Sequence, residues 1–120
     1  MFMARRVVLA FLFVTVVLSM AMVFLAPAAV GSGSAKYTVT AVDFRFKNLP
    51  ARVAPGTHTF TLVNRGKSPH DLKLAGKKTK VLKNGERSTL RVTLKKGTYA
   101  FLCTVPGHAA LGMKGKLVAR

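Results

Sequence analysis

A strict alternation of apolar and polar side chains is the clearest pattern in the chain. In residues 87–95, the positions 90, 92 and 94 are Leu or Val, and the positions between them are Arg, Thr or Lys. This period of two predicts a strand of an antiparallel sheet with one buried face. After a turn at Lys96 and Gly97, Tyr99, Phe101 and Cys103 repeat the period. The thiol is therefore expected to point into the interior.

Two further segments, residues 37–46 and 58–63, have the composition of strands. In the first, the apolar positions change parity, which predicts a bulge near Ala41 and Val42. Turn signals that contain glycine recur about every ten residues, and no segment after residue 36 has a convincing helical period. The pattern predicts an all-β domain, a small β-sandwich with Greek-key connections.

The first thirty residues have a different pattern. Residues 7–26 are an apolar run without charge, preceded by Arg5 and Arg6, as in a secretory signal peptide. A helix over this run would also reach across a hydrocarbon core of about 30 Å, so an uncleaved membrane anchor is the alternative. We expect a signal peptide or anchor helix over 1–30, a linker over 31–35 and the folded domain over 36–120. The positive-inside rule then places the domain outside the cytoplasm, in the periplasm or on the outer face of the membrane.

The chain is strongly basic, with 20 Lys and Arg residues against 3 Asp and Glu residues and a formal net charge of +17. Without Arg5 and Arg6, the expected exported part keeps 18 basic and 3 acidic residues (18 − 3 = +15). This charge favours an acidic protein partner or an anionic membrane or envelope surface; the alternative is a solvated face that only keeps an exported protein soluble. Nucleic acid is not an expected partner, because the domain is exported and its few aromatic residues fall at core positions.

Four side chains have the chemistry of a metal site. Cys103 is the single cysteine, which excludes a disulfide framework. His108 follows it by five residues, Met113 follows by ten, and His70 lies upstream after a Ser-Pro pair. Alone, each has an ordinary interpretation as a core or loop residue. Together, one thiolate, two imidazoles and one thioether form a soft ligand set that favours copper over magnesium or calcium.

At these residues the sequence resembles the cupredoxins, the plastocyanin and azurin class of type 1 blue copper proteins. The ligand loop, with its Cys-x4-His-x4-Met spacing over residues 103–113, is most similar to the rusticyanin type. The resemblance covers residues 37–119 and is also carried by the segments 43–46, 64–66, 97–99 and 112–115.

The resemblance implies one type 1 copper ion, with Cys103, His70 and His108 in a trigonal plane and Met113 as a weak axial ligand. Asp71 stands where the family often has Asn or Ser. An ionised Asp71 would lower the reduction potential, while its carboxyl group hydrogen-bonds the backbone around Thr104. The remaining histidine of the domain, at position 58, has no ligand neighbour and is interpreted as a strand-edge residue.

The predicted function is the transfer of single electrons between redox partners. Four protein ligands leave no open position for a substrate, so no enzyme activity and no catalytic residue are expected. The resemblance further implies that a redox partner docks at the apolar surface around His108. Together with the basic charge, this predicts an acidic redox protein as the partner, such as a cytochrome or an oxidase, and the chain is expected to be a monomer.

Two other functions compete with this prediction. A periplasmic copper storage or delivery protein would use the same ligands without rapid transfer of charge. A structural adhesion sandwich without metal would require the ligand set to be accidental. Copper nitrite reductases and multicopper oxidases need further histidine clusters, which this chain lacks.

Overall fold

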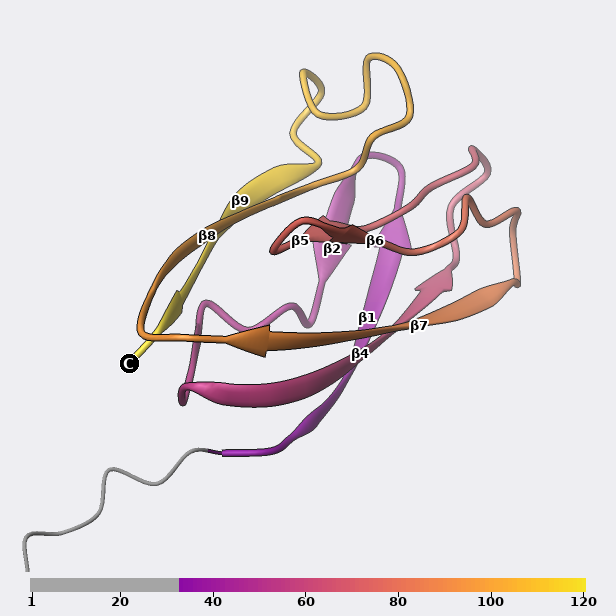
Figure 1. Cartoon of the computed structure of the whole chain (residues 1–120). Helices are drawn as coiled ribbons and strands as arrows, with labels where there is room; N and C mark the ends of the chain where they lie inside the picture. The colour runs from indigo at the N-terminus through magenta and orange to yellow at the C-terminus, as the bar shows by residue number, and fades with distance from the viewer. Residues whose placement is uncertain (1–32) are drawn as a thin grey trace, which may run out of the picture.

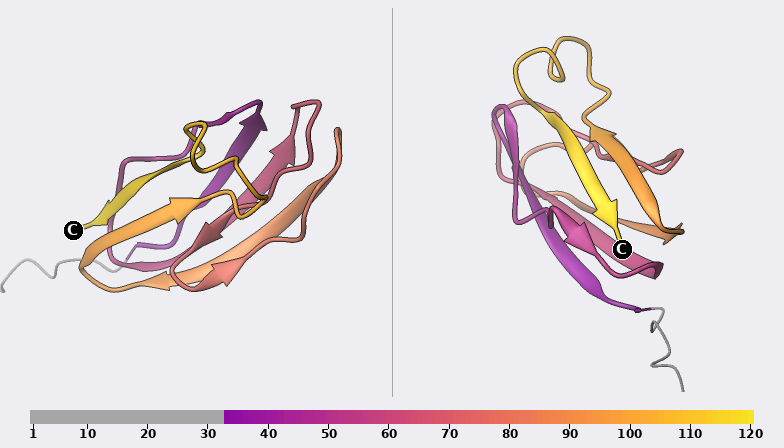
Figure 2. Two further views of the ribbon diagram at one scale, coloured as in Figure 1. Left: turned by 90° about the horizontal axis from the view of Figure 1, so that it is seen from above. Right: turned by 90° about the vertical axis from the view of Figure 1, so that its left-hand side faces the viewer.

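Two β-sheets lie face to face and enclose the core of the domain (Figures 1 and 2). The structure is a computed structural model that describes residues 33–120. The strands of this range are β1 Lys36–Val42, β2 Arg45–Lys47, β3 Arg52–Val53, β4 Gly56–Asn64, β5 Lys73–Leu74, β6 Lys77–Lys78, β7 Arg87–Leu94, β8 Gly97–Leu102 and β9 Lys114–Ala119.

The prediction of an all-β fold is confirmed for this range, which contains no helix. Accordingly, no helix among residues 33–120 has the length and apolar character needed to span a membrane. The expected signal peptide or anchor helix over 1–30 lies outside the described residues.

The first sheet has the strand order β2-β1-β4-β7. Strand β4 pairs antiparallel with β7 and parallel with β1, with Ala41 opposite Asn64 at one end of the parallel pair. The alternation of residues 87–95 has the predicted result, because Leu90, Val92 and Leu94 are buried while the arginines of β7 are exposed. Since β1 and β4 are parallel, the segments that follow them leave the sheet at the same end of the strands.

The second sheet has the order β3-β9-β8-β5-β6. Strands β5 and β6 form a hairpin with a two-residue turn, in which Ala75 and Gly76 have φ values of 51° and 75°. Positive φ at both positions is what a type I′ turn requires. Strands β8 and β9 are antiparallel neighbours, and the long loop that joins them projects from one end of the sandwich (Figure 1).

The core contains apolar side chains from both sheets. The first sheet contributes Phe60 and Leu62 of β4, and the second sheet contributes Leu74 of β5 and Leu117 of β9. All four side chains are fully buried. Cys103 directly follows β8 and is 1% exposed, which confirms its predicted inward orientation. Burial of each of the four Phe and Leu side chains stabilises the fold by about 1.5–3 kcal/mol.

The prediction of a bulge near Ala41 and Val42 is wrong. Strand β1 ends at Val42, the chain reverses, and β2 returns antiparallel with Val42 opposite Arg45. A two-residue turn shifts the alternation of apolar positions as a bulge does, so the sequence pattern alone did not distinguish the two.

His58 is also misplaced by the interpretation as a strand-edge residue. It lies in the central strand β4 and is 1% exposed. Its Nδ1 accepts a hydrogen bond from the Ala35 amide (3.2 Å), so its Nε2 donates to the carbonyl of Ala54 (2.6 Å). His58 therefore binds two backbone segments together, and residues 33–35 of the expected linker are partly fixed against β4.

Candidate metal centre

Three of the four predicted ligands come from, or directly flank, the loop between β8 and β9. Cys103 follows the last residue of β8 and Met113 precedes the first residue of β9. The Cys103 amide donates to the Met113 carbonyl (2.9 Å), and the Met113 amide donates to the His108 carbonyl (3.2 Å). The loop is therefore closed at its base, and its short length keeps these three residues together.

His70 lies in the segment between β4 and β5 and is held by backbone pairing. Its amide donates to the Leu82 carbonyl (3.0 Å) and its carbonyl accepts from the Leu82 amide (2.8 Å). Asn64, at the end of β4, donates to the carbonyls of Leu82 (2.7 Å) and Ser68 (2.9 Å). The loop before His70 is thus fixed to the strand that precedes it.

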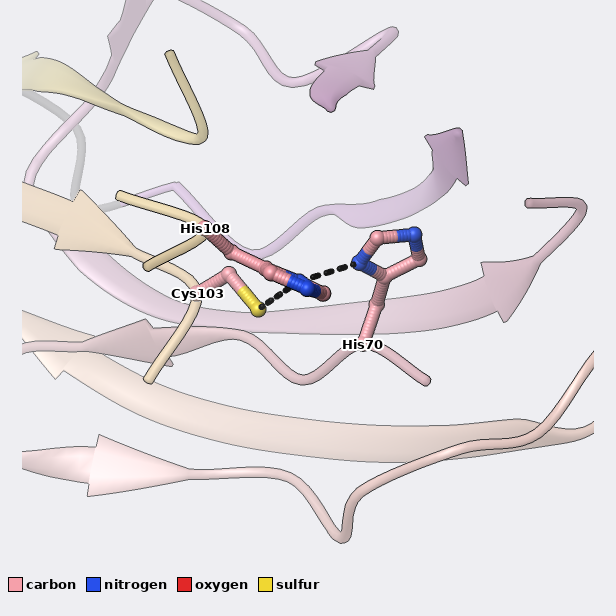
Figure 3. Close-up of side chains that lie close together, drawn as sticks. All are labelled: His70, Cys103 and His108. Atoms are coloured by element: carbon pink, nitrogen blue, oxygen red, sulfur yellow. Dashed lines mark hydrogen bonds between the residues drawn. The ribbon is translucent and has the colours of Figure 1, made fainter. Parts of the chain in front are cut away.

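The side chains of His70, Cys103 and His108 point toward one another (Figure 3). The Nδ1 atoms of the two histidines are 3.1 Å apart, and Cys103 Sγ lies 3.7 Å from His108 Nδ1. His70 and Cys103 are buried, and His108 is 9% exposed. The structure therefore brings together three of the four predicted ligands.

The arrangement fits one metal ion. Ligand nitrogens and sulfurs lie about 2.0–2.3 Å from a bound transition metal, so two of them on one ion are at most about 4.3 Å apart. The separations of His108 Nδ1 from His70 Nδ1 and from Cys103 Sγ are below that limit, and all three ligand atoms lie within 4.8 Å of one another. A thiol with two imidazoles in a buried position is a donor set typical of copper.

The place of Met113 in this cluster stays a prediction. The residue is fully buried and is joined to Cys103 and His108 through the backbone hydrogen bonds of the loop. These hydrogen bonds hold Met113 beside Cys103 and His108 at the base of the loop between β8 and β9.

The predicted contact of Asp71 with the backbone at Thr104 is confirmed. The Thr104 amide donates to Asp71 Oδ1 (2.6 Å), and the Thr104 hydroxyl donates to Oδ2. The Asp71 amide in turn faces Cys103 Sγ at 3.5 Å. Asp71 therefore joins the His70 segment to the start of the ligand loop, and its predicted effect on the reduction potential stays a prediction.

Burial also affects the thiol itself. In the protein without metal, burial raises the pKa of Cys103 above its ordinary value of 9.0, although the nearby amides of Asp71 and Val105 lower it in part. Since a metal binds the thiolate, binding must displace the thiol proton.

Sequence reasoning missed two residues at this site. Asp43, in the turn after β1, accepts a hydrogen bond from His70 Nε2 at 2.7 Å. Phe44 packs edge-on against the rings of His70 and His108, with centroid separations of 6.2 and 5.0 Å. Both residues belong to the segment that carried the family resemblance. Another usable signal was the rarity of acids, because Asp43 is one of only three in the chain.

The surface next to His108 is apolar. Pro106, Ala110 and Leu111 of the same loop are exposed, and Leu111 is 62% exposed. The exposed surface beside His108 is therefore apolar, and a protein that binds there would remove water from few polar or charged groups.

The family to which these features point is established by sequence comparison. A family model described as "Cupredoxin-like domain" matches residues 14–119, so the chain belongs to the cupredoxin-like domain family. Cupredoxins of the blue copper type bind one copper ion and are electron carriers rather than enzymes. The predicted resemblance is therefore confirmed. No curated protein matches the chain.

Three auracyanins are among the solved structures of similar fold. A dithionite-reduced auracyanin from the photosynthetic bacterium Roseiflexus castenholzii is 24% identical, with a TM-score of 0.62, covering 75% of this chain and 99% of that one. Auracyanin A from Chloroflexus aurantiacus, described as a "blue" copper protein, is 21% identical, with a TM-score of 0.62, covering 73% and 100%. Auracyanin B is 20% identical, with a TM-score of 0.61, covering 72% and 88%. At these identities the likeness concerns the fold.

Proposed function

We propose that this protein is a type 1 blue copper electron carrier whose ligands are His70, Cys103, His108 and Met113. The observation that carries the proposal is the buried cluster of one thiol and two imidazoles, with separations that suit a single ion. Met113 is proposed as the fourth ligand, and it would hold the copper through its thioether, because it is fully buried at the base of the same loop.

The surroundings of the cluster suit electron transfer. A bound copper ion would supply reversible one-electron oxidation and reduction. The residues of the chain hold the ligands at fixed positions through backbone pairing at His70 and through the closed base of the ligand loop. Ligands that are fixed before the metal changes charge need little rearrangement, and their burial excludes water from the site.

The route for the electron is the edge of His108. Of the three clustered side chains, His108 is the most exposed, at 9% against 0% for His70 and 1% for Cys103. Pro106, Ala110 and Leu111 of the same loop are exposed and apolar. A redox partner that docks there briefly would approach the site without desolvating charged groups.

The partner is proposed to be acidic. Lys77, Lys78 and Lys80 are exposed around β6, and Arg87 and Arg91 are exposed on the neighbouring strand β7. The Lys77 ammonium donates to the Arg91 carbonyl (3.2 Å), so the two basic strands are in contact. Such a surface steers an acidic protein, or an anionic membrane or envelope surface, toward the domain.

We also propose that the domain works outside the cytoplasm, with residues 1–30 as its signal peptide or anchor. The support is the uncharged apolar run over 7–26 and the two arginines before it.

The test is the visible spectrum and the voltammetry of the purified full chain loaded with Cu(II). We expect an intense thiolate-to-copper band and a reversible one-electron wave, both lost in Cys103→Ser. Thr79→Ser, at a buried hydroxyl of the hairpin region, serves as a control that should keep both. Tight binding that shows the band but no reversible wave would favour copper storage or delivery through the same ligands. Absence of Cu(II) binding would overturn the proposal.

A further inference from the structure

The carboxyl group of Asp43 contacts a predicted ligand and the loop that carries it. It accepts hydrogen bonds from His70 Nε2 (2.7 Å), from the Lys67 amide (3.0 Å) and from the Ser68 amide (3.2 Å). The His70 side chain is fully buried, and that of Asp43 is 26% exposed. One carboxylate therefore fixes both the ring of His70 and the backbone that leads to it.

The sheet topology explains this contact. Asp43 follows β1, and the segment from residue 65 to 70 follows β4, which is parallel to β1. The Arg65 amide donates to the Ala41 carbonyl (2.8 Å), so the two segments leave the sheet side by side. The contact joins residues that are 27 positions apart in the sequence.

Gly66 leaves the space that this contact occupies. A Cβ atom at position 66 would lie 2.7 Å from His70 Nε2 and would also collide with Asp43 Oδ1. The Asn84 side chain donates to the Gly66 carbonyl (2.8 Å), and the Gly66 amide donates to Asn64 Oδ1 (2.8 Å). The backbone is thus held next to the Asp43–His70 hydrogen bond, where any larger residue would separate the pair.

We propose that Asp43 is a positioning residue, which holds the His70 ring with its proton on Nε2 and the lone pair of Nδ1 toward Cys103 and His108. The negative charge of Asp43 also stabilises bound Cu(II) more than bound Cu(I). The inference rests on the proposed function and extends it to the reduction potential. A carboxylate that accepts from the outer nitrogen of a ligand histidine fixes its tautomer and makes it a stronger donor.

The side chain that pairs with the Asp43 carboxylate is His70. Among the described residues, no lysine or arginine forms an ion pair with Asp43, whereas Asp71 has Lys78 at 3.9 Å. Although the chain has 20 basic residues, the two acids that contact the ligand segments are two of only three acids in the whole sequence. A negative charge beside a ligand stabilises the ion of higher charge more strongly.

The test compares Asp43→Asn, which keeps an acceptor of the same shape, with Glu86→Gln, which removes the same charge elsewhere. Glu86 is exposed and its carboxylate accepts from the Lys83 amide instead (2.8 Å). In the full chain, we expect Asp43→Asn to lower the ratio of Cu(II) to Cu(I) affinity about tenfold, which raises the reduction potential by about 59 mV for a one-electron couple. Glu86→Gln should shift it far less.

A second measurement needs no metal. In the apo protein, the nitrogen chemical shifts of His70 should show a protonated Nε2 and a bare Nδ1, and Asp43→Ala should abolish this preference. Gly66→Ala, which keeps every charge, should weaken Cu(II) binding about 10-fold or more by separating the pair. A potential in Asp43→Asn equal to that of Glu86→Gln, or apo His70 protonated on Nδ1, would overturn the inference. If the wild-type protein lacks the thiolate-to-copper band, the proposed function fails instead.

Discussion

The buried carboxyl group of Asp71 should be one of the strongest single contributors to the stability of the protein without metal. Asp71 is fully buried, and its two oxygens accept from the amide and from the hydroxyl of Thr104. Asp71→Ala removes both acceptors at once and leaves two donors near the start of the ligand loop. The ion pair with Lys78, at 3.9 Å and with a half-exposed lysine, adds little.

The expected cost follows from these two hydrogen bonds. A donor left without its acceptor costs about 1–3 kcal/mol, so the loss of both acceptors costs about 3 kcal/mol, toward the low end of the sum. In a domain of this size, 1 kcal/mol corresponds to about 4–8 °C in Tm. Asp71→Ala should therefore lower the Tm of the apo protein by about 12 °C or more.

The assay is thermal unfolding of the apo full chain, followed by circular dichroism. Thr104→Val, which removes the hydroxyl donor and keeps the amide, should cost about half as much. In the Thr104→Val background, Asp71→Ala should cost less than it does alone, because the two residues share one hydrogen bond. A Tm in Asp71→Ala within about 4 °C of the wild type would refute this account of the loop.

Three further outcomes are expected. Gly115→Ala puts a Cβ atom in collision with Cζ of Phe101 and 3.0–3.1 Å from the two Cε atoms of its ring, so it should cost about 1–3 kcal/mol in thermal unfolding, whereas Lys116→Ala on the same strand should be neutral. The pKa of Cys103 is raised above 9.0 in the folded apo protein, so the thiol of the unfolded chain ionises at lower pH. The free energy of unfolding of the wild type should therefore fall more steeply above pH 9.0 than that of Cys103→Ala. The same pH dependence in both proteins would contradict this. Electron transfer with an acidic redox protein should slow as salt is raised from 0.01 to about 0.1 M, and Lys77→Gln/Lys78→Gln should flatten that dependence. A rate independent of salt would remove the steering role.

Much of the site was predictable because its parts are local in the chain. Cys103, His108 and Met113 lie within eleven residues, so tight turns alone keep them close. The strand alternation that ends at Cys103 correctly placed the thiol in the interior. The contact between Asp71 and Thr104 was expected from the family resemblance, and the structure confirms it.

The errors arose where two structures produce the same local pattern. A bulge and a tight turn both change the parity of apolar positions, so the hairpin of β1 and β2 was interpreted as one bent strand. His58 has the parity of a buried residue, but its two backbone partners, Ala35 and Ala54, are fixed only by the path of other segments.

The sequence by itself determined the all-β class, the inward thiol and the close spacing of three ligand candidates, because these depend on interactions between residues near one another in the chain. Only the tertiary structure decided that β1 and β4 run parallel, and hence that Asp43 meets His70. Contacts over such separations require closed loops and a defined strand order, and no local pattern of side chains specifies them.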